Sequence, residues 1–152
     1  ILLAGGSFGA LFAPAVAAAE QRVSAVAILF GAADLYSVLE RNLDMPTPTR
    51  QVLSWIGTTI VSPMEPAKYI HRIAPRPVFM LNGTEDPVMP EGSVRLLHET
   101  AREPKTVKWI PLGHVDVRSS EFHIVILDEL VDWLVEIDFV PPEDAASVLA
   151  LR

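Results

Sequence analysis

The segment Gly5-Gly6-Ser7-Phe8-Gly9 places a serine among glycines, between two apolar stretches of the chain. Before it, Ile1-Leu2-Leu3-Ala4 is a short apolar run that stops at glycines, as a buried strand does. After it, the alanine-rich stretch from Phe8 to about Gln21 predicts a helix. A serine on a tight strand-to-helix turn takes strained dihedrals, and side chains at the flanking positions would collide with neighbouring backbone. The segment therefore predicts a Ser7 hydroxyl beside a helix N-terminus, with a glycine-rich turn and an incidental serine as the alternative.

The remainder of the chain alternates between apolar strands and helices. We expect further strands at residues 23–30, 77–82 and 106–110, because each is a short apolar run. The expected helices lie at 35–43, from a capping box at Ser62 through Ile70, at 90–102, and after Ser119 or Ser120. A further apolar piece lies around Trp55. Near-uniformly apolar strands that alternate with helices predict an α/β fold with a doubly wound, mostly parallel sheet and helices on both faces. The Pro141-Pro142 tail predicts a loose end.

Composition and charge exclude several classes of protein. The 152 residues are half apolar and one fifth charged, which is the profile of a soluble globular domain with its own core. A net charge of −7 without a basic patch argues against a nucleic-acid partner. The chain has no cysteine, and its four histidines lack the spacing of metal ligands, so we expect no metal site.

The N-terminal stretch, residues 1–19, carries no charge, which leaves a signal peptide or a membrane span as alternatives. Both alternatives are disfavoured, because no basic region precedes the apolar run and four residues interrupt it: Gly5, Gly6, Gly9 and Pro14. We therefore expect no membrane partner and a cytoplasmic location. Because the sequence lacks an initiator methionine, we also expect that it begins inside a larger protein.

Two later segments place an acid and a histidine directly after predicted strands. Asn82-Gly83-Thr84-Glu85-Asp86 follows the strand at 77–82, and Pro111-Leu112-Gly113-His114 follows the strand at 106–110. Together with the serine motif, this order of Ser, acid and His resembles the α/β-hydrolase family, particularly its dienelactone-hydrolase-like esterases. The resemblance extends from residue 1 to about 138 and matches only the second half of that fold. It implies that residues 1–152 are the C-terminal part of a single α/β-hydrolase domain that has further strands before Ile1.

The resemblance also implies roles for individual residues. Ser7 would be the nucleophile, His114 the general base, and Asp86 the acid that orients the imidazole. The backbone N–H of Phe8 would be one oxyanion donor, and a loop before Ile1 would supply the second. The implied activity is hydrolysis of small-molecule carboxylic esters through an acyl-enzyme, without a cofactor. A peptidase of the same fold and a non-catalytic fragment that keeps the triad residues remain alternatives.

Other carboxylates and histidines compete for the acid and base roles. Asp34 follows the strand at 23–30, a position that some family members use, whereas Glu85 would point elsewhere and Asp116 is too close in sequence to His114. The remaining histidines fall within predicted helices, where surface or core histidines are the commoner case: His71, His98 and His123.

Residues 34–62 lie between two predicted strands, where this family commonly inserts lid elements. Met45, Trp55 and Ile56 in this segment either line an apolar substrate pocket or form a local hydrophobic cluster under a loop. The sequence leaves both alternatives open.

Overall fold

The computed structural model describes residues 1–116 and 118–150, and the chain divides into two compact units, Ile1–His114 and Val115–Arg152. The first unit contains a four-stranded sheet in which the strand order β1-β2-β3-β4 follows the sequence. All neighbouring strands are parallel, because a helical connection returns the chain to the same end of the sheet each time. The strands are β1 (Leu2–Gly6), β2 (Ala25–Leu29), β3 (Val78–Gly83) and β4 (Lys105–Ile110). The predicted α/β class and parallel sheet are confirmed.

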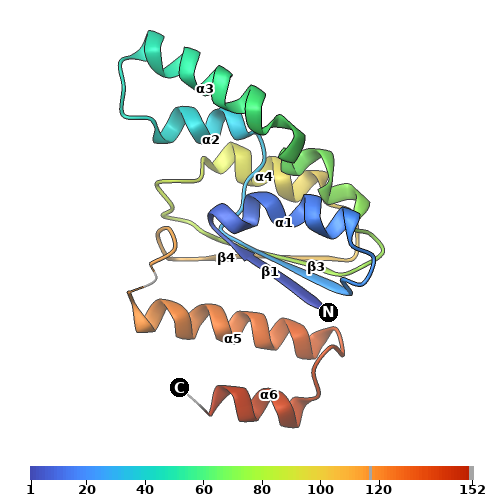
Figure 1. Ribbon diagram of the computed structural model, residues 1–152. Helices are drawn as coiled ribbons and strands as arrows, with labels where there is room; N and C mark the ends of the chain where they lie inside the picture. The colour runs from blue at the N-terminus through green and yellow to red at the C-terminus, as the bar shows by residue number, and fades with distance from the viewer. Residues whose placement is uncertain (117, 151–152) are drawn as a thin grey trace. The chain divides into compact units, whose positions relative to one another are not determined.

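One face of this sheet carries a helical layer. Helices α1 (Phe8–Ala19) and α4 (Glu91–Thr100) lie along the same face, as Figure 1 shows. Their apolar side chains share one buried cluster with those of β2 and β3: Ala10, Ala17, Val26, Ile28, Val78, Met80 and Leu97. The cluster fixes the start of α1 and the ends of the strands relative to one another. That helices also cover the second face of the sheet stays a prediction.

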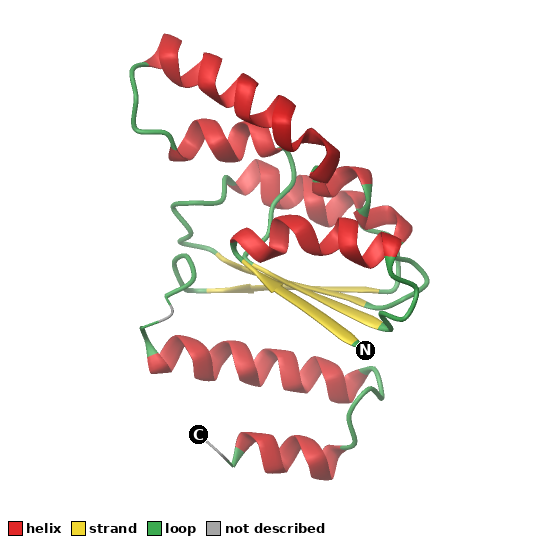
Figure 2. Ribbon diagram, in the orientation of Figure 1, coloured by secondary structure: helices red, strands yellow, loops and turns green. Residues whose placement is uncertain are grey.

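Residues 34–62 form a helical hairpin, which consists of α2 (Leu35–Asn42) and α3 (Thr47–Val61). The two helices pack against each other and are joined by a short loop, which is visible in Figure 2. The apolar piece expected around Trp55 is a helix of 15 residues that begins beside Pro46 and has a second proline in its first turn, where the missing N–H is least costly.

The capping box predicted at Ser62 is wrong. Ser62 follows the end of α3, and its hydroxyl donates to the Thr59 carbonyl oxygen at 3.1 Å. Instead of a helix, the chain continues through the 3₁₀ turns η1 (Ser62–Met64), η2 (Pro66–Lys68) and η3 (Ile70–Arg72). The Glu65 carboxylate accepts from the backbone N–H groups of Asp34 and Leu35, each at 2.9 Å, and so holds the start of α2.

The second unit contains helices α5 (Ser120–Glu136) and α6 (Pro142–Leu149), which contact each other. Ser119 caps α5 by accepting a hydrogen bond from the Phe122 N–H at 3.2 Å, as the sequence predicted. The prediction of a loose tail is wrong, because Pro142 is the first residue of α6, a position that tolerates a missing N–H.

The uncharged N-terminal stretch is part of the folded first unit, since it forms β1 and α1 and buries Ala10 and Ala17. Along the described part of the chain, no helix is both long and apolar enough to span a bilayer. β1 pairs only with β2 in this sheet, so it forms one edge.

Candidate active site

Ser7 occupies the turn between β1 and α1 with a backbone φ of 51° and ψ of −114°. This left-handed φ is strained for a residue with a side chain, and local hydrogen bonds maintain it. The Ser7 N–H donates to the Leu29 carbonyl oxygen at 2.9 Å, and the Ser7 carbonyl oxygen accepts from the Ala10 N–H at 3.0 Å. The turn therefore presents the serine at the carboxyl end of β1, as the sequence predicted.

Gly5 and Gly9, which lie two positions before and two positions after the serine, differ in their surroundings. A Cβ atom on Gly5 would lie 2.6 Å from the Gly9 carbonyl oxygen, which is closer than any side chain tolerates. A Cβ atom on Gly9 would meet nothing within 4 Å. The expected collision is confirmed for Gly5, and it is wrong for Gly9 among the residues that the structure describes.

Three side chains from separate loops meet at the carboxyl end of the sheet. The Ser7 Oγ lies 2.6 Å from the Nε2 of His114, and the Nδ1 of His114 lies 2.7 Å from the Oδ2 of Asp86. Because an ionised carboxylate can only accept a hydrogen bond, this geometry suits the His114 tautomer that has its proton on Nδ1 and offers the Nε2 lone pair to the serine hydroxyl. The side chains of His114 and Asp86 are 16% and 3% exposed, so water has little access to their bond.

The Asp86 carboxylate is held on both of its oxygens. The Oδ1 accepts from the backbone N–H of Val88 at 2.8 Å and from that of Met89 at 3.1 Å. These two bonds leave the Oδ2 directed at His114. Charge-assisted hydrogen bonds of this kind are about twice as strong as neutral ones, and they fix the orientation of the carboxylate.

The loop that carries the acid is bonded to the loop that carries the histidine. The Thr84 N–H donates to the Ile110 carbonyl oxygen at 2.8 Å, and the Glu85 N–H donates to the Leu112 carbonyl oxygen at 3.2 Å. The loops meet over Gly83, where a Cβ atom would lie 2.1 Å from the Leu112 oxygen. The end of β3 must therefore be a glycine if the two loops are to meet.

The competing acids have other partners. Asp34 adopts a left-handed φ of 54° and caps α2 through a bond from the Ser37 N–H at 3.4 Å. Asp116 accepts from the Arg118 N–H at 2.9 Å, and the side chain of Glu85 is exposed. None of these carboxylates is bonded to His114 in the described residues.

His98 is a buried core histidine, one of the two cases, surface or core, that were expected for a histidine in a predicted helix. Its Nε2 lies 3.1 Å from the Asn82 Oδ1, and its ring packs against that of Trp109. Burial, reinforced by the positive charges of Lys105 and Arg95, lowers the pKa of His98 from 6.5 to about 4. This histidine is therefore neutral at pH 7 and takes no part in the bonded series of Ser7, His114 and Asp86.

Phe30 is a neighbour of the site that the sequence did not single out. Its ring lies edge-on to the His114 ring at 5.9 Å between centroids, and its side chain is fully buried. Its φ of 55° turns the chain directly after β2. Phe30 is the last residue of an apolar run, and nothing in that run indicates a positive φ.

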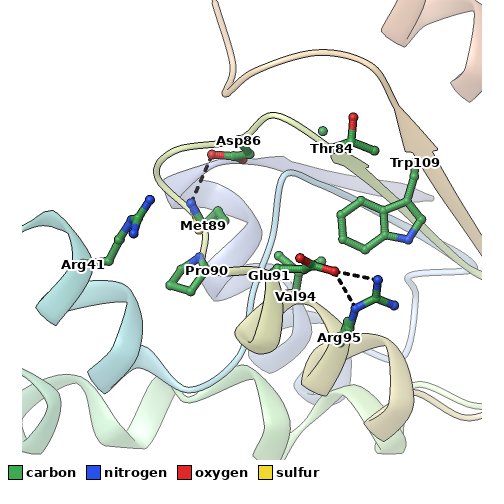
Figure 3. Close-up of a pocket in the computed structure, with 10 residues that line it drawn as sticks. Arg41, Thr84, Asp86, Met89, Pro90, Glu91, Val94, Arg95 and Trp109 are labelled. Carbon is green, nitrogen blue, oxygen red and sulfur yellow. Dashed lines mark hydrogen bonds and ion pairs between the residues drawn. The ribbon is translucent and has the colours of Figure 1, made fainter.

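A cavity of about 460 Å³ borders the acid loop on the side of α4. Figure 3 shows Asp86 at its rim, the Glu91–Arg95 ion pair across it, and the indole of Trp109 along one wall. Met45, Trp55 and Ile56 do not line this cavity; they are 42%, 65% and 42% exposed on the helical hairpin. Their role in substrate binding stays a prediction, as does that of Phe8, whose ring is exposed beside that of Phe12.

Helix α1 begins at Phe8, so the first N–H groups of this helix have no carbonyl partner within it. They lie next to the Ser7 hydroxyl in sequence and form the positive end of the helix dipole. A negatively charged oxygen beside the Ser7 hydroxyl would find donors there. Among residues 1–116 and 118–150, no group of three or more His, Asp and Glu side chains is placed to hold a metal ion.

Comparisons with known sequences give short matches. No model of a known protein family matches the chain. The uncharacterized protein YfhR of Salmonella typhi is 35% identical over 66 residues, which are 43% of this chain and 23% of that protein. YfhR of Escherichia coli strain K12 is 28% identical over 89 residues, 58% of this chain and 31% of that protein. The matched region thus spans less than a third of these curated relatives.

Solved structures match a much larger share of the chain. The α/β hydrolase GrgF from Penicillium sp. superposes with a TM-score of 0.64 at 19% identity, over 88% of this chain and 62% of that one. An esterase domain from Rhodothermus marinus gives 0.67 at 17%, over 88% and 60%. A puromycin-hydrolyzing peptidase from Mycobacterium tuberculosis gives 0.68 at 22%, over 93% and 23%.

Proposed function

We propose that this chain, which has part of the α/β-hydrolase fold, carries the catalytic triad of a serine hydrolase that cleaves carboxylic esters of small molecules. The observation that carries the proposal is the hydrogen-bonded series from the Ser7 Oγ through His114 to Asp86 at a strained strand-to-helix turn. A nucleophile, a base within reach of it and a group that orients the base are the arrangement that acyl transfer requires.

In the proposed reaction, the Nε2 of His114 removes the hydroxyl proton as the Ser7 Oγ attacks the ester carbonyl carbon. The Phe8 N–H stabilises the oxyanion that forms. Collapse of the tetrahedral intermediate expels the alcohol, which takes the proton from His114, and leaves an acyl group on Ser7. Water then attacks the acyl carbon as it loses a proton to the same nitrogen, and collapse of the second tetrahedral intermediate releases the acid while His114 returns that proton to the Ser7 Oγ. Asp86 keeps the imidazole in the correct tautomer and stabilises its charged form without taking the proton.

We also propose that the chain is the C-terminal part of a single α/β-hydrolase domain. Its 60% and 62% coverage of the esterase domain and of GrgF supports this proposal, as does the edge position of β1. A strand that precedes this segment would pair with β1 and would bring the loop that supplies the second oxyanion donor. Removing one such donor costs about 10²–10³ in kcat, so residues 1–152 alone would be a poor catalyst.

The test compares wild type and Ser7→Ala in the complete gene product, with p-nitrophenyl esters and peptide p-nitroanilides as substrates. We expect ester hydrolysis in wild type and a loss of at least about 10³-fold in kcat for Ser7→Ala. Anilide turnover faster than ester turnover would favour a peptidase, which is what the mycobacterial protein is described as. Equal activity of the two proteins would refute the proposal.

A further inference from the structure

The last turn of α2 contacts the loop that carries Asp86. The Nε–H of Arg41 donates to the Pro87 carbonyl oxygen at 3.1 Å. The side-chain amide of Asn42 donates to the Val88 carbonyl oxygen at 2.9 Å and to the Val38 carbonyl oxygen, within α2, at 2.7 Å. Both hydrogens of the Asn42 amide are therefore used, and the bond to Val38 fixes the side chain on its own helix.

The carbonyl oxygens that bind Arg41 and Asn42 belong to two consecutive peptide groups, and the N–H groups of these same peptides bind the Asp86 carboxylate. The peptide group of Pro87 and Val88 accepts from Arg41 at its oxygen and donates its N–H to the Asp86 Oδ1 at 2.8 Å. The next peptide group accepts from Asn42 at the Val88 oxygen and donates the Met89 N–H to the same Oδ1 at 3.1 Å. Consecutive hydrogen bonds polarise one another, so each α2 side chain strengthens the N–H that holds the carboxylate.

These contacts matter because the Oδ1 bonds determine how the carboxylate is rotated. With the Oδ1 held by two N–H groups, the Oδ2 is aligned with the Nδ1 of His114 at 2.7 Å. If the peptide groups tilted, the carboxylate would turn with them and the imidazole would lose its alignment with Ser7. A displacement of about 1 Å in a catalytic group can lower the rate about 10²-fold.

We propose that Arg41 and Asn42 are positioning residues for Asp86, so that the helical hairpin of residues 34–62 sets the orientation of the catalytic acid through two peptide groups. This inference rests on the proposed function. It gives the hairpin a role in holding the triad, in addition to any contact that Met45 or Trp55 makes with a substrate.

The experiment is a double-mutant cycle in the complete gene product between Asn42→Ala and Asp86→Asn. Asn42→Ala should lower kcat for a p-nitrophenyl ester about five- to tenfold, the effect of one lost hydrogen bond, while KM changes less than about twofold. Arg41→Ala should act in the same direction. Phosphonylation of Ser7 by a fluorophosphonate, followed over hours, keeps the slow Asp86→Asn proteins measurable. In the Asp86→Asn background, Asn42→Ala should cause no further loss in the rate of phosphonylation.

Glu40→Ala is the matched control, because Glu40 also lies on α2 and, among the residues that the structure describes, its carboxylate pairs with Arg50 at 4.0 Å rather than with the acid loop. Thermal unfolding of each variant shows whether α2 remains folded, and isosteric Asn42→Asp removes the same donors without a cavity. An Asn42→Ala rate equal to that of Glu40→Ala, or an equal further loss in the Asp86→Asn background, would overturn the inference. If Ser7→Ala stays active, the proposed function itself fails, which is a separate result.

Discussion

Gly83 and Leu112 approach each other so closely that a Cβ atom on Gly83 would lie 2.1 Å from the Leu112 carbonyl oxygen. The loops that follow β3 and β4 cross at this point, and they carry Asp86 and His114. A methyl group here would push the histidine loop away from the acid loop.

Gly83→Ala should therefore impair catalysis as well as stability. We expect a loss of about 1–3 kcal/mol in the free energy of unfolding from overpacking, and a loss in kcat of up to about 10²-fold from misplaced His114. Gly92→Ala in α4 is the control, since its Cβ would meet nothing within 4 Å. Urea unfolding and ester hydrolysis measure the two effects, and a Gly83→Ala protein that behaves like Gly92→Ala would contradict the crossing of the loops.

The serine turn offers a second matched pair. Gly5→Ala should be destabilised by about 1–3 kcal/mol, because its Cβ would meet the Gly9 carbonyl oxygen at 2.6 Å. Gly9→Ala should be neutral or more stable by up to about 1 kcal/mol, since alanine favours the helix and meets no neighbour. Both free energies of unfolding come from urea titration. A reversed order would show that the turn differs from the one described.

His98 should make stability depend on pH. Burial lowers its pKa to about 4 from 6.5, so between these values the unfolded chain binds more protons than the folded one. The stabilisation is complete above pH 6.5 and is lost as the pH falls toward about 4. The slope is at most about 1.4 kcal/mol per pH unit. Urea unfolding between pH 4 and 6.5 should show that the free energy of unfolding of His98→Gln lacks the pH-dependent contribution of His98. Identical pH profiles for wild type and His98→Gln would argue against this contribution.

Asp86 and Asp34 are distinguished by a pair of isosteric substitutions. Asp86→Asn should lower kcat about 10⁴-fold, because an amide in this position stabilises the wrong tautomer of His114. Asp34→Asn should change kcat less than about twofold, since asparagine caps a helix and tolerates a left-handed φ as well as aspartate does. Steady-state ester hydrolysis gives both values. A large loss of kcat for Asp34→Asn would show that the acid role belongs to Asp34 and not to Asp86.

The parallel α/β fold was predicted from apolar strands that alternate with helices, and the meeting of Ser7, Asp86 and His114 was expected from the resemblance of three short motifs to those of the α/β-hydrolase family. What the sequence missed depends on contacts between distant residues. The Ser-Pro-Met-Glu pattern at Ser62 predicted a local capping box, yet the Glu65 carboxylate binds backbone 30 and 31 residues earlier in the chain. The bonds of Arg41 and Asn42 to the acid loop span 46 residues, and no local pattern marks them.

Covalent labelling of Ser7 tests the central claim most directly. The complete gene product is treated with a fluorophosphonate, and the modified peptide is mapped by mass spectrometry in wild type, His114→Ala and Ser7→Ala. A serine activated by His114 at 2.6 Å should be modified stoichiometrically in wild type. We expect labelling at least about 10³-fold slower in His114→Ala and none at residue 7 in Ser7→Ala. An adduct on another residue, or equal labelling of wild type and His114→Ala, would contradict the assignment of Ser7 as a His114-activated nucleophile.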